Sequence, residues 1–256
     1  MDCSHTDIVD IFSEFIKGMN NSSNLAAQAL DSPKQLKISN KEQLDAARNR
    51  PVPETYMRWT LAAIEEVIGT ASLESILSKT NLERLIDNYP PANPTLSSNL
   101  TVGDHANICS EVVRTYGYVG KQEVIRIGRL GAKPALETQG KFFNFAARKA
   151  AKLLPSSMQI KTVLESMQSD VKKLYAGSGY SSDITIENRG NKWAYIDESC
   201  ACCAGKVSND YICWIWNGTL EESLHWLTDK EFKVEQVECR AMGDETCTWE
   251  IDKATL

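Results

Sequence analysis

The sequence has no apolar run long enough to cross a membrane and no basic, apolar leader at its N-terminus. A membrane-spanning helix needs about 20 largely apolar residues, and a secretory leader begins with positive charge. The first seven residues instead include Asp2 and Asp7 and contain no Lys or Arg. We therefore expect a cytoplasmic protein without a membrane span, in which the thiols are reduced.

Clustered positive charge is also scarce. The 256 residues carry 28 Lys and Arg against 34 Asp and Glu, a formal net charge of −6. Phosphate contacts depend on grouped Lys and Arg side chains. The composition argues against broad binding to nucleic acids or anionic membranes, and short basic runs such as Lys172-Lys173 are expected on solvated helix faces.

Signatures of common catalytic sites are missing. The chain has no phosphate-binding Gly-Lys-Ser/Thr loop, and its histidines (His5, His105 and His225) are isolated in sequence. Gly128-Arg129-Leu130-Gly131 and Gly177-Ser178-Gly179 are interpreted as turn signals, because neither lies in the strand–loop–helix setting of a dinucleotide site. We predict no catalytic residues, and a role as an enzyme is less favoured than a role in binding.

Cysteine, by contrast, is concentrated near the C-terminus. Cys239 and Cys247 flank a Gly243-Asp244 turn between two strand-like runs, a hairpin that would bring their sulfur atoms together. Thiols packed this densely usually share a metal or a redox partner. Six of the eight cysteines belong to this region: Cys200, Cys202, Cys203, Cys213, Cys239 and Cys247.

Hydrophobic spacing predicts helices followed by strands. Residues 1–53 are more polar and end in Pro51-Val52-Pro53, which predicts an N-terminal helical extension and linker before a ligand-binding domain at 54–256. After Gly179 the period shortens to two, and a meander interrupted by a helix at 211–227 closes the chain. This order predicts an α+β fold rather than a parallel sheet. Earlier helices are expected within 57–86, 108–116, 142–153 and 160–174.

The C-terminal region carries a family resemblance. Ile212-Cys213-Trp214, the helix that contains Gly218 and the run from Phe232 to Cys247 resemble the 4-vinyl reductase domain, most recognisably over about residues 184–252. That domain also occurs in the aromatic-sensing region of bacterial phenol- and xylene-responsive regulators. Upstream, Ile127-Gly128-Arg129 is one of several segments similar to family members from photosynthetic bacteria.

The resemblance implies a fold related to the haem nitric-oxide-binding proteins and to vesicle-tethering subunits. In that fold a helical layer packs on a four- to five-stranded antiparallel sheet, often in a homodimer. It also implies a zinc site, whose ligands would correspond to Cys213, Gln236, Cys239 and Cys247. Gln236 stands where the sensors have a glutamate, and a neutral amide oxygen is a poor ligand for zinc, which takes four donors in structural sites.

We therefore expect a further donor from Cys200, Cys202 or Cys203, because four thiolates form a closed structural zinc shell. Other interpretations stay open. The thiols could ligate an iron–sulfur cluster, form a redox-sensitive vicinal pair, or have no specific role, and Cys213, Cys239 and Cys247 could simply be small buried side chains.

Aromatic side chains gather around the predicted sheet. Ligand pockets are mostly apolar with a few placed polar groups, although core packing accounts for many aromatic residues. Trp193 falls close to the position of a ligand-contacting Trp in the aromatic sensors, and His105 precedes a helix in the half where relatives line their pocket. The candidate ligand contacts are Trp193, Phe142, Phe145, Trp214, His105 and Tyr195.

These features predict a metal-stabilised module that binds a hydrophobic or aromatic small molecule. Occupancy would be signalled through a homodimer or a protein partner. One alternative is an accessory factor in tetrapyrrole (chlorophyll) metabolism or photosystem assembly, with a bound tetrapyrrole ligand. Another is an iron–sulfur or purely structural dimerisation protein.

Overall fold

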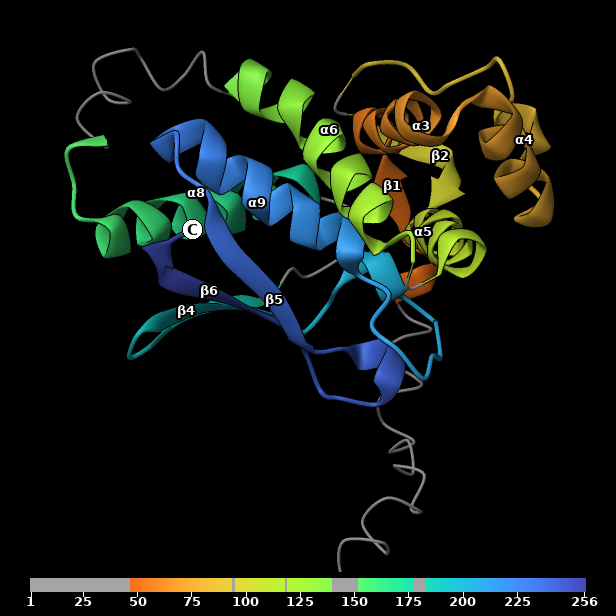
Figure 1. Cartoon of the computed structure of the whole chain (residues 1–256). Coiled ribbons are helices and arrows are strands. Elements are labelled where there is room, and N and C mark those ends of the chain that lie inside the picture. The colour runs from red at the N-terminus through yellow and green to blue at the C-terminus, as the bar shows by residue number, and fades with distance from the viewer. Residues whose placement is uncertain (1–46, 94, 118, 140–151, 177–182) are drawn as a thin grey trace, which may run out of the picture. The chain divides into compact units, whose positions relative to one another are not determined.

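An antiparallel sheet from the C-terminal part of the chain carries the helices (Figure 1). Its four strands are β3 (Ile184–Arg189), β4 (Lys192–Asp197), β5 (Phe232–Glu238) and β6 (Cys247–Thr255), in the order β3-β4-β6-β5. All neighbouring strands are antiparallel. The predicted α+β fold with a four-stranded antiparallel sheet is confirmed.

This computed structural model describes residues 47–93, 95–117, 119–139, 152–176 and 183–256. All of them belong to one unit, Ile38–Leu256. The predicted extension lies almost wholly outside the described residues, so its boundary at residue 53 stays a prediction. Phe142 and Phe145 lie outside them as well.

The two faces of the sheet differ in chemistry, because side chains alternate along each strand. On one face Trp193, Tyr195 and Trp249 are buried, and Tyr195 lies opposite Trp249 in the β4–β6 register. The other face carries ion pairs, among them Lys192 Nζ to Glu250 Oε2 at 2.8 Å. The apolar face therefore belongs to the core and the charged face points away from it.

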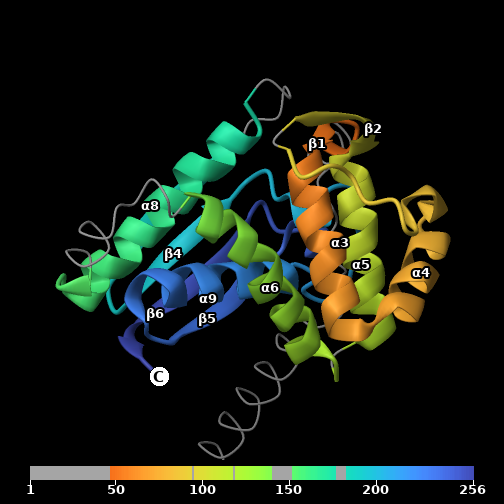
Figure 2. The ribbon, with the colours of Figure 1, turned by 90° about the horizontal axis from the view of Figure 1, so that it is seen from above.

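Helices cover the apolar face in layers (Figures 1 and 2). α8 and α9 contact the sheet, α6 packs on α9, and α3 packs on α6. None of the described helices is both long and apolar enough to cross a membrane. The helices are α3 (Glu54–Ile68), α4 (Thr70–Lys79), α5 (Val102–Tyr116), α6 (Lys121–Gln139), α8 (Ser156–Leu174) and α9 (Trp214–Thr228), with short 3₁₀ turns η1 (Glu83–Leu85), η2 (Ala201–Cys203) and η3 (Arg240–Met242) and a two-stranded sheet of β1 (Pro51–Pro53) and β2 (Leu96–Thr101).

The α6–α9 contact corrects one prediction from the sequence. The segment 128–131, interpreted as a turn, lies inside α6. A Cβ on Gly128 would lie 1.9 Å from the carbonyl oxygen of Ile215, and one on Gly218 would lie 1.9 Å from that of Ile125. These glycines are required because the two helix backbones touch, not because the chain turns.

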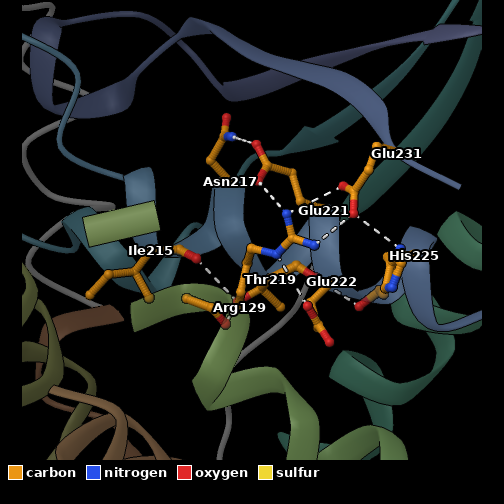
Figure 3. A network of polar contacts seen from close by, with 10 residues as sticks. Arg129, Ile215, Asn217, Thr219, Glu221, Glu222, His225 and Glu231 are labelled. Atoms are coloured by element: carbon orange, nitrogen blue, oxygen red, sulfur yellow. Dashed lines mark hydrogen bonds and ion pairs between the residues drawn. The ribbon is translucent and has the colours of Figure 1, made fainter. Parts of the chain in front are cut away.

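Arg129 joins the same two helices to the start of β5 (Figure 3). Its guanidinium lies 3.2 Å from Glu222 Oε2 on α9 and 3.1 Å from Glu231 Oε1. His225 Nδ1 lies 3.1 Å from the same Glu231 oxygen. Glu222 is buried, so the pairing with Arg129 compensates for its desolvation. The ion pairs fix α6 against α9 beside the glycine contact.

The N-terminus of α5 is closed by a reciprocal cap. Thr101 Oγ1 accepts a hydrogen bond from Asp104 N at 3.1 Å, and Asp104 Oδ2 accepts one from Thr101 N at 2.8 Å. Thr101→Ala removes the first of these bonds and is expected to cost about 1 kcal/mol, which corresponds to about 2–4 °C in Tm for a unit of this size.

Scanning calorimetry measures this change. The matched control is Ser75→Ala, an exposed position within α4, where a change within about 0.5 kcal/mol is expected. Equal melting of the Thr101→Ala variant and the wild type would show that the cap does not stabilise α5.

Candidate metal centre and ligand cavity

Four buried cysteines from three segments converge at one end of the sheet. Cys200 and Cys203 belong to the η2 segment, Cys213 is the N-cap residue of α9, and Cys247 begins β6. Their sulfur atoms all lie within 4.8 Å of one another. We call these residues the cysteine quartet.

The spacing of the quartet suits a single ion. The Cys203 and Cys247 sulfurs are 3.4 Å apart, and those of Cys200 and Cys213 are 3.7 Å apart. Two sulfurs bound to tetrahedral zinc at about 2.3 Å lie about 3.8 Å from each other. All four cysteines are free and fully or almost fully buried. The donor set and the distances fit a closed four-thiolate zinc site.

The β5–β6 connection holds Cys247 in place. Gly243 adopts a φ of +92°, which favours glycine, at the end of η3. Arg240 N donates a hydrogen bond to Cys247 Sγ at 3.4 Å, and Cys239 N donates one to Asp244 Oδ2 at 3.0 Å. Backbone donors aimed at sulfur favour its thiolate form.

Cys239 and Gln236 lie beside the quartet. Cys239 is buried, with its sulfur 3.9 Å from that of Cys213, but it is not one of the four mutually close donors. Gln236 Nε2 donates to Glu238 O at 3.1 Å, and its buried Oε1 accepts no hydrogen bond from the described residues. The quartet contains two of the three cysteines implied by the family resemblance, together with Cys200 and Cys203.

The thiols influence one another's protonation. Burial raises the pKa of the Cys213 and Cys247 thiols. Hydrogen bonds from Cys202 and Cys203 lower the pKa of Cys200. A bound cation would displace the retained protons, so metal affinity would fall as the pH falls.

A second group of donors lies next to the quartet. It consists of His105 and Cys109 on α5 and Cys202 on η2, whose ligand atoms lie within 4.8 Å of one another. Cys109 Sγ is 3.5 Å from His105 Nε2. The sequence prediction did not include Cys109, although positions 105 and 109 are separated by one helical turn and therefore share a face.

A cavity of about 180 Å³ lies above the η2 segment. Its wall combines α3, α6, α8 and α9 with the end of β4. Most of the lining is apolar or aromatic. The large apolar side chains include Trp59, Ile127, Met167, Leu174, Trp216 and Trp226.

Two polar groups of the lining distinguish this cavity from ordinary core. Trp216 Nε1 is buried and has no hydrogen-bond partner among the described residues. Burial, helped by Cys200, raises the pKa of Asp197 to about 8. Asp197 Oδ1 accepts a hydrogen bond from Ser199 N at 2.8 Å. An indole N–H and a protonated carboxyl can both donate to a ligand oxygen.

The cavity and the quartet are built from the same two segments. Cys200, Ala201 and Cys202 line the cavity, and so does the face of α9 that begins at Ile215, two residues after Cys213. A change in the position of η2 or of the start of α9 therefore alters both sites.

The predicted aromatic contacts occupy other places. Trp193 Nε1 donates to Ser157 Oγ on α8 at 3.0 Å, and Tyr195 lies between Trp216 and Trp249 at ring-centroid distances of 6.0 and 6.2 Å. Trp214 is buried beneath Lys121. Neither these residues nor His105 line the cavity, and their role as ligand contacts stays a prediction.

The sequence analysis did not select Trp59, Trp216 or Trp226 as contacts. A signal was present on α9, where Trp216, Thr219 and Ser223 recur at helical spacing and place small polar groups on an otherwise apolar face.

Two solved H-NOX structures share this fold. The Fe(II) unliganded H-NOX protein from K. algicida has a TM-score of 0.51 at 11% identity, over 78% of this chain and 96% of that chain. A doubly substituted Tt H-NOX has a TM-score of 0.50 at 15% identity, over 78% of this chain and 94% of that chain. The predicted relation to the haem nitric-oxide-binding fold is confirmed, and at these identities the likeness concerns the fold alone. No curated protein matches this sequence significantly.

Haem, which this fold family implies, does not fit the residues present here. The cavity of about 180 Å³ is smaller than the roughly 300–1,000 Å³ typical of pockets for larger organic ligands. No histidine lines it, and the His105 ring instead contacts Thr60 and Cys109.

The sequence family is identified in the C-terminal region. Residues 193–253 match the family model of the 4-vinyl reductase domain. The matched span includes η2, α9, β5 and most of β4 and β6, and therefore all four cysteines of the quartet. By this match the C-terminal part of the chain is similar to the 4-vinyl reductase domain, and the predicted resemblance is confirmed over residues 193–253.

Proposed function

We propose that this protein is a sensor module for a small aromatic molecule, in which a zinc ion bound by the cysteine quartet holds one wall of the ligand cavity. The observation that carries this proposal is the shared construction of the two sites. Cys200 belongs to the quartet and also lines the cavity, and Cys213 is the N-cap residue of the helix that supplies Trp216.

The size and lining of the cavity define the ligand class. An engineered apolar cavity of about 150 Å³ holds benzene, so a cavity of about 180 Å³ suits one aromatic ring with a small substituent. Trp216 Nε1 offers a donor that has no partner among the described residues. A phenol, with a ring and one oxygen, satisfies both features, whereas a tetrapyrrole is too large for the same space.

The geometry of the quartet favours one ion over a cluster. Two sulfurs bound to the same ion at about 2.3 Å are at most about 4.6 Å apart, close to the 4.8 Å limit within which all four ligand atoms lie. An iron–sulfur cluster places several iron atoms between its cysteines and needs wider spacing. Zinc is the preferred occupant because it combines thiolate ligands with tetrahedral geometry.

Ligand occupancy would be reported through η2 and α9. A ligand shifts a conformational equilibrium only as far as it prefers one state. A phenol that contacts both Trp216 and the Cys200–Cys202 segment would favour the arrangement in which the two elements are held together. We propose that a homodimer or a protein partner reads this difference.

Trp216→Phe tests the ligand site. The substitution keeps an aromatic ring but removes the N–H, so phenol binding should weaken by about 1 kcal/mol, or about fivefold in Kd. Toluene, which has no oxygen, should bind almost equally to the variant and the wild type. Isothermal titration calorimetry on the zinc-loaded full chain measures both affinities.

Trp193→Phe is the matched control, because Trp193 Nε1 donates to Ser157 and does not line the cavity. Its phenol affinity should equal that of the wild type. A loss of phenol binding in Trp193→Phe but not in Trp216→Phe would show that the ligand lies at the position implied by the aromatic sensors instead.

A further inference from the structure

We propose that His105, Cys109 and Cys202 form a second metal site, separate from the cysteine quartet, that binds Zn²⁺ with three protein ligands. The proposal goes beyond the sensor function and does not depend on it. The three ligand atoms lie within 4.8 Å of one another and come from two elements in contact, α5 and η2.

The donors are arranged toward a common point. His105 and Cys109 are one helical turn apart on α5, so their side chains leave the same face. Cys109 Sγ lies 3.7 Å from His105 Nδ1 and 3.5 Å from Nε2. Cys202 reaches this pair from η2, while Cys200 and Cys203 on the same segment belong to the quartet. The η2 turn thus divides its thiols between two centres.

A core role alone accounts poorly for this group. His105, Cys109 and Cys202 are all at most 1% exposed, and a buried imidazole is costly unless its nitrogens have partners. An apolar side chain would fill the same space without that cost. The convergence of an imidazole and two thiols, the donors that zinc prefers, is therefore better explained by an ion.

The surroundings of His105 also suit a ligand. Thr60 Oγ1 donates to Tyr56 O at 3.0 Å and lies 3.3 Å from His105 Nε2, so its oxygen can accept an N–H from the ring. In that tautomer the Nδ1 lone pair is available to a cation. Metal-binding histidines commonly donate their other N–H to an oxygen in this way, which fixes the ring orientation.

Three protein ligands leave a fourth position on zinc. Sites with two cysteines and one histidine take a water molecule or a substrate in that place. Tyr56, Thr60 and Cys202, which surround or belong to the second group, also line the cavity. The open position therefore faces the cavity, and Zn²⁺ binding would release the Cys109 and Cys202 protons to solvent.

Metal stoichiometry tests the proposal. The full chain is purified with a reductant and no chelator, loaded with Zn²⁺ and freed of excess, and then analysed by native mass spectrometry and elemental analysis. Two zinc ions per chain are expected in the wild type, and one in both Cys109→Ala and His105→Gln. Cys109→Ala keeps a small apolar group in the core, and circular dichroism reports whether each variant is folded.

Cys247→Ala is the matched control, because it removes a quartet ligand and leaves the second group intact. It should also retain one zinc, and double substitution with Cys109→Ala should remove both. The proposal is overturned if Cys109→Ala and His105→Gln hold as much zinc as the wild type. It is also overturned if thiol titration of unfolded, zinc-free protein reveals a Cys109–Cys202 disulfide.

The outcomes separate this site from the quartet. One zinc in the wild type that is lost only in Cys247→Ala supports the quartet and refutes the second site. One zinc that is lost only in Cys109→Ala and His105→Gln supports the second site and refutes the metal role of the quartet. Substitution with Co²⁺ adds a spectroscopic readout, since only the second site contains a nitrogen ligand and its visible bands should change when phenol enters the cavity.

Discussion

Alanine at Cys247 is expected to lower the Tm of the zinc-loaded protein by about 10 °C. A ligand that binds only the folded state stabilises it by about 4 kcal/mol at 1,000 times its Kd, and one kcal/mol corresponds to about 2–4 °C in a unit of this size. Cys247 joins β6 to the quartet, so its loss frees the last hairpin from the start of α9. Scanning calorimetry with and without a chelator measures the change.

Cys239→Ala separates the quartet from the ligand set implied by the family resemblance. Cys239 lies next to Cys213 but outside the four mutually close donors, whereas Cys203 lies among them. Zinc content and Tm should therefore fall in Cys203→Ala and change much less in Cys239→Ala. The reverse order would mean that Cys239, and not Cys203, completes the shell.

The effect of pH on this increment has a defined sign. Burial raises the pKa of the Cys213 and Cys247 thiols, and zinc binds their deprotonated forms. Lowering the pH therefore favours the protonated, metal-free cluster. The difference in Tm between zinc-loaded and chelated protein should shrink as the pH falls, and an increment that stays constant or grows would argue against thiolate ligands.

The sequence predicted the part of the metal centre that depends on local structure. Cys213 lies at a helix start and Cys247 beside a turn, and both positions follow from periodicity and turn chemistry. The contributions of Cys200 and Cys203 could not be assigned, because the direction of each thiol in η2 depends on packing against α5 and α9. The same tertiary contact sends Cys202 toward Cys109, a partner distant in the sequence.

The ligand cavity was less accessible to sequence analysis. Alternation along β4 places Trp193 and Tyr195 on the buried face, but it does not decide which buried aromatic side chains reach an open space. That depends on how α6 lies across α9. The glycine of α6 that sets this crossing, Gly128, was interpreted as a turn signal, because a glycine in a helix is recognised only when the neighbouring backbone is known.

Alanine at Gly218 is expected to destabilise the protein by about 3 kcal/mol or more, since inserting a methyl group into a tight contact commonly costs about 1–3 kcal/mol and rigid backbone leaves little room for relief. The new Cβ would lie 1.9 Å from the Ile125 carbonyl oxygen and 2.9 Å from Arg129 N. The higher helix propensity of alanine, worth about 1 kcal/mol, offsets only part of this cost. Urea unfolding followed by circular dichroism measures the difference.

Gly131→Ala is the matched control on α6. Its Cβ would meet Ala63 Cβ and Trp59 O at 3.7 Å, an ordinary contact distance, so helix propensity should leave stability unchanged or raise it by up to about 1 kcal/mol. Gly218→Ala should also weaken phenol binding, because α6 and α9 both line the cavity and cannot separate without changing its shape. If Gly218→Ala were as stable as Gly131→Ala, the two backbones would not be in contact, and the cavity would lose the rigid wall on which its selectivity for a single ring depends.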